Sequence, residues 1–489
     1  MDNTIDILVI GAGITGCAVA RALSRFQCSV GVLDRACDVA EGATKANSGI
    51  VHAGYDAMPG TQKAYYNVRG AAMYPALCRE LGVPYRQNGS LVIGFDEKEK
   101  QHLAELKARG EQNGVQGLEL LDREAALRLQ PSLNPEVYAA LRVPTGAIVS
   151  PYELAFALAD DAALNGVIFA FDQEVTSLTR EPDGMFAVRT GSGVLRCRAL
   201  VNCAGASGAA LHNLLSEDKK TMVHRRGQYY LLDRSAEQPF DMTVFQCPSE
   251  MGKGVLVTPT VHGNLLLGPT AEDVEDPMDT ATTAEGLAQI LKKASRTWPG
   301  LSTRTNITNF SGIRAHLTTD DFIVGPCADV PGLFEAIGIE SPGLSSAPAI
   351  AEVLSGDIAA YLRLKPKEKT AAYPLPPVPF REMTPEEQAA AVARDPAYGN
   401  LICRCEVVTE AEIRHAIRRP VGARTVDGVK RRTRAGMGRC QGGFCMPRVA
   451  AILAEETGVP LTAVTKDGGN SYLLDDTVAS FLKGEAAHE

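Results

Sequence analysis

The chain has 489 residues, 45% of them hydrophobic, which is enough for about two or three domains with cores of their own. Its formal net charge of −9 argues against a protein that binds nucleic acid. No stretch approaches the ~20 apolar residues that span a bilayer, and the first residues read as a strand entering a turn rather than as a signal peptide. We therefore expect a cytoplasmic protein without a transmembrane segment; peripheral association with the inner face of the membrane stays open.

The N-terminal segment has the glycine spacing of a dinucleotide-binding turn. Gly11, Gly13 and Gly16 stand between a predicted strand, residues 5–10, and a predicted helix rich in alanine. Gly11 makes the turn, Gly13 admits the pyrophosphate and Gly16 lets the helix approach the strand. Asp34 ends the next predicted strand, 18 residues after Gly16, where a carboxylate can bind a ribose hydroxyl. The pattern predicts a dinucleotide whose phosphates lie at the helix N-terminus.

Two later segments favour FAD over NAD. Residues 41–64, EGATKANSGIVHAGYDAMPGTQKA, form a polar loop rather than another strand and helix, and such a loop can run along an extended cofactor. Near residue 340 the sequence predicts a strand, a turn at Ser341 to Gly343 and a helix beginning near Ser345. The free N–H groups of this turn would face the pyrimidine end of a flavin and stabilise negative charge on the reduced ring.

Together these segments resemble the D-amino-acid oxidase-like superfamily of FAD enzymes, and the resemblance extends over most of residues 1–362. It implies that the ADP half of FAD is bound at Gly11, Gly13, Gly16 and Asp34, and the flavin half along Thr44, Lys45, Asn47, Ser48 and Gly49. It also places Val175 at the adenine, Ala204 and Gly205 in a second turn against the dinucleotide, and Gly343, Leu344 and Ser345 at the flavin pyrimidine.

The same resemblance implies an α/β (α+β) fold with two interleaved domains. A Rossmann-like FAD-binding domain is expected from residues 1–80, 145–215 and 315–362, and an antiparallel-sheet substrate domain from residues 81–144 and 216–314. In the second piece, segments such as GQYYLLD alternate as antiparallel strands do. Residues 363–399 are rich in proline and are expected to form an extended linker over the surface.

Flavin-dependent oxidation of an alcohol or amine needs a base for the O–H or N–H proton, while the neighbouring C–H delivers a hydride to flavin N5. Histidine suits that role, and His52 is the one histidine inside the predicted flavin loop. We expect it to contact substrate or flavin, including through a covalent flavin bond; the alternative is a hydrogen bond to the loop backbone. His262 and His316 are weaker candidates.

Arg314 is the predicted anchor for an anionic substrate. It follows an apparent strand just before the last predicted FAD segment, and the superfamily resemblance implies an arginine there for a substrate carboxylate or phosphate. A guanidinium binds either anion through two parallel hydrogen bonds. The alternative is a structural salt bridge. Further pocket candidates, for which a structural role is equally expected, are Lys63, Tyr55 and Arg226.

Four cysteines near the C-terminus form a candidate metal site: Cys403, Cys405, Cys440 and Cys445. Four thiolates can hold a [2Fe-2S] cluster, a [4Fe-4S] cluster or zinc. The first pair encloses one residue and the second pair four, so the paired knuckles of structural zinc sites are missing. We therefore favour a cluster over zinc and over no metal. The other eight cysteines are scattered singly and are expected to be small buried hydrophobic residues.

The segments ICRCE and RRTRAGMGRCQGGFC resemble the [2Fe-2S] domain of the bacterioferritin-associated ferredoxin type, as found at the end of the anaerobic glycerol-3-phosphate dehydrogenase large subunit. The resemblance covers about residues 400–460 and implies that the four cysteines bind one [2Fe-2S] cluster. We expect residues 400–489 to form this domain and a C-terminal tail. Basic residues between 414 and 439 are either a solvated face that balances cluster charge or a docking surface for an acidic redox partner.

The leading hypothesis is an FAD-dependent dehydrogenase that oxidises sn-glycerol 3-phosphate to dihydroxyacetone phosphate. Electrons would pass from the flavin through the [2Fe-2S] cluster to a redox partner subunit of a hetero-oligomer. The flavin loop NSGIVHAGY is instead similar to that of L-2-hydroxyglutarate dehydrogenase, whose substrate is also a small anion with a secondary alcohol. The alternatives are therefore an L-2-hydroxyacid dehydrogenase, an amine or imino-acid dehydrogenase, and an electron-transfer flavoprotein subunit with a vestigial pocket.

Overall fold

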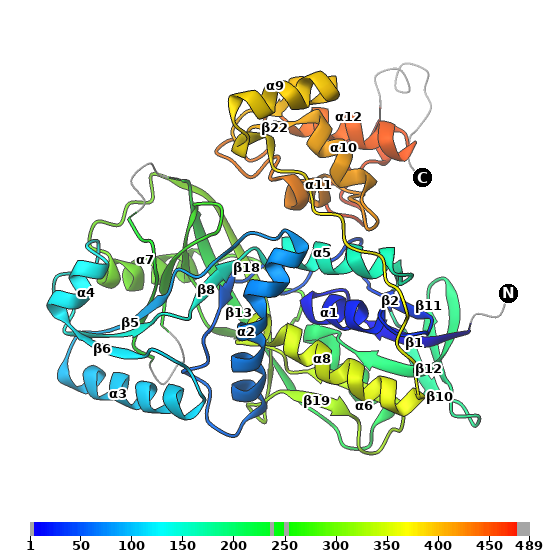
Figure 1. The fold of residues 1–489 in the computed structure, drawn as a ribbon, viewed down its shortest axis with the longest axis horizontal. Helices are drawn as coiled ribbons and strands as arrows, with labels where there is room; N and C mark the ends of the chain where they lie inside the picture. Colours follow the sequence, from blue (N-terminus) through cyan, green and yellow to red (C-terminus); the bar gives the residue numbers. More distant parts are fainter. Residues whose placement is uncertain (1–3, 235–238, 249–253, 477–489) are drawn as a thin grey trace.

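The computed structural model describes residues 4–234, 239–248 and 254–476 (Figure 1). Two large sheets lie side by side, and a small helical domain lies across them. Within the described ranges, no helix is long and apolar enough to cross a membrane.

The first sheet has a parallel centre with the N-terminal strand in its middle. β1 (Thr4–Ile10) lies between β12 (Gly193–Asn202) and β2 (Val30–Leu33). β2 is fully buried, as expected of a parallel strand that is covered on both faces. The remaining strands are the parallel β9 (Ile168–Ala170) and β20 (Leu333–Ile337) and the antiparallel β10 (Ser177–Arg180), β11 (Phe186–Thr190) and β19 (Ile323–Pro326).

Helices pack together against the first sheet. α1 (Ile14–Leu23) contacts α5 (Pro151–Leu164) and α8 (Gly343–Leu362), and α8 contacts α2 (Gln62–Leu81). The short η1 (Gly205–Ser207) leads from β12 into α6 (Gly208–Leu215). Because α1 follows β1 and α8 follows β20, both helices begin beyond the carboxyl ends of parallel strands, where open α/β sheets bind their ligands.

The second sheet is antiparallel except at one pairing. Its strands are, in order, β17 (Glu272–Val274), β13 (Met222–Leu232), β16 (Leu265–Gly268), β15 (Leu256–Pro259), β14 (Thr243–Gln246), β5 (Ser90–Gly94), β7 (Ala139–Val143) and β6 (Glu119–Asp122), with β18 (Asn306–Leu317) paired to β13. The parallel pairing of β14 with β5 unites two segments that are far apart in the sequence. The two sheets confirm the predicted α/β (α+β) fold class with interleaved segments, because the chain leaves each sheet and returns to it later.

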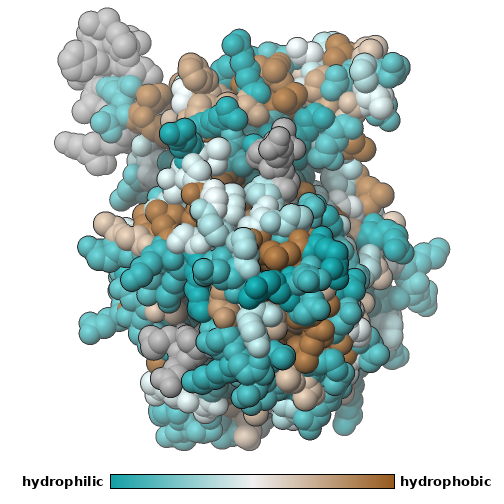
Figure 2. All heavy atoms as spheres, turned by 90° about the vertical axis from the view of Figure 1, so that its left-hand side faces the viewer, coloured by the Kyte–Doolittle hydropathy of each residue, from teal (hydrophilic) through white to brown (hydrophobic). Residues whose placement is uncertain are grey.

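Helices and a small sheet complete this half of the molecule. The helices are α3 (Glu97–Gln112), α4 (Arg123–Leu129) and α7 (Ala284–Thr297). The small sheet contains β3 (Ile50–Val51), β8 (Ala147–Val149) and β4 (Tyr85–Arg86). The end of the molecule formed by the second sheet is mostly hydrophilic, with its apolar residues in small separate groups (Figure 2).

The C-terminal domain, residues 380–476, has a core of its own. Buried side chains from its last three α-helices, such as Ile413, Val429 and Leu453, pack together. The elements are η2 (Phe380–Glu382), α9 (Pro385–Arg394), η3 (Pro396–Gly399), β21 (Leu401–Cys403), β22 (Val408–Thr409), α10 (Glu410–Arg418), α11 (Val426–Thr433), α12 (Met446–Thr457) and η4 (Leu461–Ala463).

The segment expected to be a proline-rich linker, residues 363–399, is helical in its second half. It contains no helix up to residue 379 and runs along the side of the first-sheet half (Figure 1). α9 then begins because Thr384 and Glu387 form a capping box and Pro385 occupies the first helical turn. The chain therefore joins the C-terminal domain some twenty residues before the first predicted metal ligand.

Arg432 joins the C-terminal domain to the first-sheet half. Its Nη1 donates to Asp38 Oδ2 at 2.5 Å and its Nη2 to Asp38 Oδ1 at 2.7 Å. The guanidinium carbon lies 3.9 Å from the centre of the Phe156 ring, a stacking contact that favours arginine. The side chains of Arg432 and Asp38 are 0% and 4% exposed, so each charge depends on the other for compensation.

Arg431 and Arg419 make contacts of the same kind. Arg431 pairs with Glu41, and Arg419 pairs with Asp160; the four side chains are 1–14% exposed. These arginines belong to the basic segment that the sequence offered as a solvated face or as a surface for an acidic partner. At these positions both interpretations are wrong, because the charges are buried against the first-sheet half.

We predict that Arg432→Met destabilises the protein by about 3–5 kcal/mol, because it leaves the Asp38 carboxylate buried with only the more distant Arg431, at 3.8 Å, as a cationic partner. The matched control is Arg418→Met in α10, whose side chain is 65% exposed and pairs with Glu456; its cost should stay below about 1 kcal/mol. Chemical unfolding followed by circular dichroism measures both. Equal losses of unfolding free energy in the two variants would show that the buried pair of Arg432 and Asp38 has no special role.

Candidate functional site

The turn between β1 and α1 accepts only glycine at two positions. Gly11 has φ +105°, and a Cβ atom there would lie 2.3 Å from the carbonyl oxygen of Cys203. A Cβ atom at Gly16 would lie 1.8 Å from the carbonyl oxygen of Gly11. The close approach also brings the second predicted turn, Ala204 and Gly205, against the first. The structure thus places two predicted dinucleotide contacts beside each other.

The N-terminus of α1 is arranged for an anion. Gly13 is its N-cap and provides no side-chain cap, so the backbone N–H groups face outward from the helix start. Thr44 Oγ1 accepts a hydrogen bond from Ile14 N at 3.0 Å, and Asp34 Oδ2 accepts one from Ala12 N at 2.7 Å. Burial raises the pKa of Asp34 against the opposing effect of its N–H donors. This cradle fits the pyrophosphate and ribose of FAD.

Residues 44–49 of the flavin loop are held in shape by their own polar groups. Asn47 Nδ2 donates to the Thr44 carbonyl at 2.9 Å, and Asn47 Oδ1 accepts from Gly49 N at 2.8 Å. Lys45 pairs with Glu41 and with Asp467 of the C-terminal domain. Val175, the predicted adenine contact, packs against the apolar core that includes Leu178, Phe186 and Val188 of β10 and β11.

The start of α8 lies beside His52. Ser345 Oγ accepts a hydrogen bond from the His52 backbone N–H at 2.7 Å, and Ser345 is 0% exposed. The Tyr74 hydroxyl donates to the Leu344 carbonyl at 2.5 Å. The His52 ring lies 5.8 Å from the ring of Phe245 in β14. The predicted pyrimidine element and the predicted base therefore meet at the junction of the two sheets.

Arg314 projects from β18 toward the flavin loop. A Cβ atom at Gly312 would lie 2.2 Å from the carbonyl oxygen of Ala46, so β18 touches the loop there. Arg314 stands two residues further on the same face of the strand. It lies close to Tyr229, whose hydroxyl is hydrogen-bonded to Ser48. Tyr229 is a site residue that sequence reasoning missed, because a tyrosine in an alternating strand carries no signal of its role.

A cavity of about 370 Å³ adjoins the flavin loop. Its wall comes from the loop, from the start of α5, from the second sheet around Thr260 and Asn309, and from the C-terminal domain around Lys430 and Gln441. Asn309 Oδ1 is buried and has no hydrogen-bond partner among the described residues. An unsatisfied acceptor on the wall fits a polar ring system such as the flavin.

Other predicted pocket residues are engaged in ion pairs or packing. Lys63 Nζ and His316 Nδ1 each lie 2.8 Å from Glu340 Oε1. Arg226 pairs with Glu272 and Asp279, and Tyr55 is buried in an apolar core. These contacts support the structural alternative for Lys63, Arg226 and Tyr55, and they show that His316 is half-buried in an ion pair.

His262 lines the cavity but has both ring nitrogens occupied. Arg381 Nη2 donates to His262 Nδ1 at 3.1 Å, and His262 Nε2 lies 2.7 Å from Glu153 Oε1. Since arginine can only donate, Nδ1 is the acceptor and Nε2 carries the proton. His262 therefore links the cavity wall to Arg381 of the C-terminal domain.

The four predicted metal ligands form two pairs. Cys405 Sγ lies 3.6 Å from Cys440 Sγ, and Cys403 is hydrogen-bonded to Cys445. Cys403 and Cys445 are 1% and 2% exposed, whereas Cys405 is exposed. The Cys445 thiol and the backbone N–H groups of Gly436 and Glu406 lower the pKa of Cys403, against the effect of burial. One pair thus faces inward and the other outward.

The spacing of the two pairs distinguishes between metal centres. A tetrahedral zinc site with Zn–S bonds of about 2.3 Å holds all four sulfurs about 3.8 Å apart. In the described part of the chain, no three of these four sulfurs lie within 4.8 Å of one another. Two close pairs held apart fit a [2Fe-2S] cluster, in which each iron takes two thiolates.

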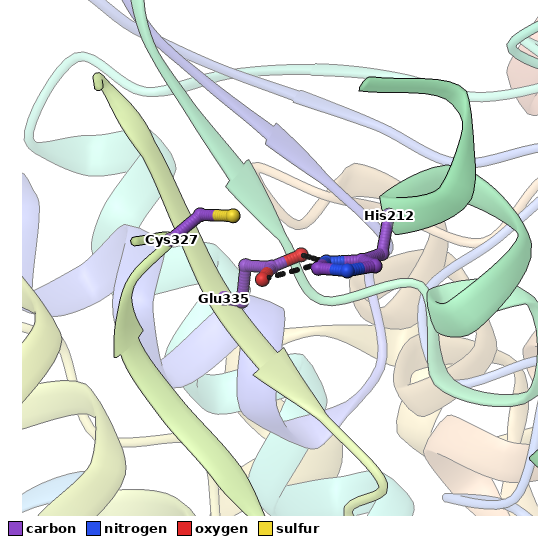
Figure 3. A group of neighbouring side chains, drawn as sticks. All are labelled: His212, Cys327 and Glu335. Carbon is purple, nitrogen blue, oxygen red and sulfur yellow. Dashed lines mark hydrogen bonds and ion pairs between the residues drawn. The ribbon is translucent and has the colours of Figure 1, made fainter. Parts of the chain in front are cut away.

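His212, Cys327 and Glu335 form a second cluster of metal-binding residue types (Figure 3). His212 Nδ1 lies 2.9 Å and 3.0 Å from the Glu335 oxygens, and Nε2 lies 2.7 Å from the Asp218 carbonyl oxygen. Both ring nitrogens thus face acceptors, and Cys327 Sγ donates to Asp329 instead. We interpret this cluster as a buried ion pair that ties α6 to β20.

Comparisons with known proteins agree with this geometry. A family model described as "FAD dependent oxidoreductase" matches residues 6–356, and one described as "BFD-like [2Fe-2S] binding domain" matches residues 401–455. The chain is 46% identical over 471 residues to a glycerol 3-phosphate dehydrogenase of Caloramator mitchellensis, which covers 96% of this chain and 98% of the relative. It is 29% identical to the mitochondrial L-2-hydroxyglutarate dehydrogenase of Arabidopsis thaliana over 71% of this chain and 82% of the relative.

A solved structure supports the same assignment. The FAD-bound L-alpha-glycerophosphate oxidase of Mycoplasma pneumoniae superposes with a TM-score of 0.73 and 30% sequence identity, covering 77% of this chain and 99% of that one. The FAD and [2Fe-2S] cofactors and both family resemblances predicted from the sequence are confirmed by these matches.

We predict about two iron atoms and about two sulfides per chain in protein purified without oxygen, and no zinc. Cys403→Ser should lose the iron, because the inward pair then lacks one thiolate. Cys327→Ser is the matched control, since this cysteine lies outside the set, and its iron content should equal that of the unmodified protein. Metal analysis with visible spectroscopy checks both. One zinc per chain without iron would contradict the assignment.

Proposed function

This chain belongs to the FAD dependent oxidoreductase family and carries a BFD-like [2Fe-2S] binding domain, and from that membership we propose that it oxidises sn-glycerol 3-phosphate to dihydroxyacetone phosphate. The observation that carries the proposal is 46% identity to a glycerol 3-phosphate dehydrogenase along 96% of this chain and 98% of the relative. Identity over both sheets and the C-terminal domain covers the substrate side as well as the cofactor side. FAD supplies a two-electron acceptor and the [2Fe-2S] centre a one-electron carrier.

Arg314 binds the phosphate of the substrate. One of its Nη groups donates to the Thr270 carbonyl, which leaves other N–H groups of the guanidinium for an anion. Gly227 on β13 makes room for the guanidinium, since a Cβ atom there would lie 2.6 Å from Arg314 Nη2. Tyr229, hydrogen-bonded to Ser48, holds the anchor next to the flavin loop.

His52 takes the proton of the substrate hydroxyl. Oxidation of a secondary alcohol to a ketone removes two electrons and two protons, and the hydroxyl proton needs a base within hydrogen-bond reach. The backbone N–H of His52 donates to Ser345 Oγ and fixes the main chain there, and the Phe245 ring lies beside the imidazole. A base fixed there would accept the proton of the hydroxyl whose carbon faces the cofactor.

The electrons leave through the [2Fe-2S] centre to a partner subunit of a hetero-oligomer rather than to oxygen. The relative named a dehydrogenase matches this chain along both domains, whereas 77% of this chain covers 99% of the structure named an oxidase. Cys405 is exposed, and Phe444, next to the ligand Cys445, is 85% exposed. An exposed aromatic ring beside a metal ligand is suited to contact with another protein.

A second candidate function is oxidation of L-2-hydroxyglutarate or a related 2-hydroxyacid. It is favoured by the 29% identity to the Arabidopsis enzyme and by the flavin-loop sequence NSGIVHAGY. Arg314 would then bind a substrate carboxylate instead of the phosphate, and His52 would again accept the hydroxyl proton.

We predict that kcat/KM for sn-glycerol 3-phosphate exceeds that for L-2-hydroxyglutarate by about 100-fold or more, because a site built for one anion leaves polar groups unpaired with the other. The measurement is anaerobic turnover with an artificial electron acceptor. Activity on the hydroxyacid alone would transfer the proposal to the second candidate.

We predict that His52→Gln lowers kcat by about 10²–10⁴-fold, because the hydroxyl proton loses its base. FAD content should stay unchanged, and it is measured from the visible spectrum. His102→Gln, on α3 and paired with Glu105, is the control and should leave kcat unchanged. A His52→Gln enzyme that retains full kcat would assign the proton transfer to another group.

A further inference from the structure

Lys430 of α11 lines the cavity beside the flavin loop and is a cation without a direct partner. Its ammonium makes no hydrogen bond or ion pair with any residue in the described ranges, although it feels the charges of Asp427, Lys466, Arg431 and Asp467. Lys430 is half-buried at the cavity wall, and this burial lowers the pKa of its ammonium. A half-buried cation that has no carboxylate of its own is placed to bind an anion that enters the cavity.

The carboxylates nearest to Lys430 are already paired with other cations. Asp427 binds Lys466 at 2.6 Å. Asp467 lies 3.2 Å from both Lys45 and Arg431. Neither carboxylate is therefore available as the main partner of Lys430.

Lys430 also stands between the cavity and the inward cysteine pair. Its Cδ lies 4.0 Å from the position that a Cβ atom of Gly436 would occupy, so the lysine stem runs along that glycine. The backbone N–H of Gly436 donates to Cys403. Lys430 thus packs against the segment that follows α11 and supports Cys403, and it lines the same cavity as residues 45–49 of the flavin loop.

We infer that Lys430 is an anion-binding group that the C-terminal domain supplies to the flavin cavity. The inference rests on the proposed function in one respect, namely that this cavity receives the flavin and the substrate. The anion is either the negative charge that two electrons and one proton leave on the flavin ring or the phosphate of the substrate; an ammonium binds both through the same electrostatic attraction. The C-terminal domain then completes the flavin site and does more than carry electrons away.

The test uses the full chain with both cofactors, purified without oxygen, as the unmodified protein and as Lys430→Met and Lys430→Arg. Lys292→Met on α7, an exposed lysine of the second-sheet half, is the matched control. The midpoint potential of the flavin is measured by anaerobic redox titration, and KM for sn-glycerol 3-phosphate by turnover. The visible spectrum of the cluster verifies that the four predicted cysteine ligands still bind it.

If the anion is the reduced flavin, Lys430→Met makes flavin reduction about tenfold less favourable, which is about 30 mV for a two-electron couple. If it is the phosphate, KM rises about tenfold while the flavin potential stays constant. Lys430→Arg keeps the charge and should restore whichever quantity moved. The inference is overturned if Lys430→Met matches Lys292→Met in both. Should the unmodified protein fail to oxidise glycerol 3-phosphate, the flavin potential still decides the role of Lys430, so the two failures are distinguishable.

Discussion

The position of the C-terminal domain depends on buried ion pairs that join it to the first-sheet half. Arg432 with Asp38 and Arg419 with Asp160 place charges where water does not reach them. Such pairs contribute little net stability, but their geometry is demanding, because a displaced partner leaves a bare charge in the interior. They therefore fix the orientation of the C-terminal domain. Without that orientation, the cavity beside the flavin loop would lose the wall that the C-terminal domain provides.

The docked arrangement brings the C-terminal domain to the cavity beside the flavin loop, because Lys430, Met437 and Gln441 line that cavity. Burial of Cys403 and Cys445 and exposure of Cys405 make the two sides of the metal centre unequal. The inward pair is shielded by protein, whereas Cys405 and the ring of Phe444 are exposed.

The sequence predicted the cofactor sites well because they are local. The spacing of Gly11, Gly13 and Gly16 lies within a single strand, turn and helix, so it can be recognised in the sequence without knowledge of the distant Cys203 that also excludes a side chain at Gly11. The four cysteines, likewise, have a recognisable spacing whatever surrounds them. The burial of Arg419, Arg431 and Arg432 could not be predicted, because an arginine that will be buried looks the same in the sequence as one that stays in water. Tyr229 could not be found either, since its role arises from Ser48, far away in the chain.

By itself the sequence determined the fold class, both cofactors and the residue types that hold them, since these follow from short-range spacing and from the steric demands of tight turns. Only the tertiary structure decided which charges are buried, which cysteine pair faces outward and which residues share the cavity wall. Arg432 meets Asp38 across 394 residues of chain, and Lys430 faces the flavin loop from another domain. Contacts over such separations depend on how whole domains pack, and no local pattern encodes them.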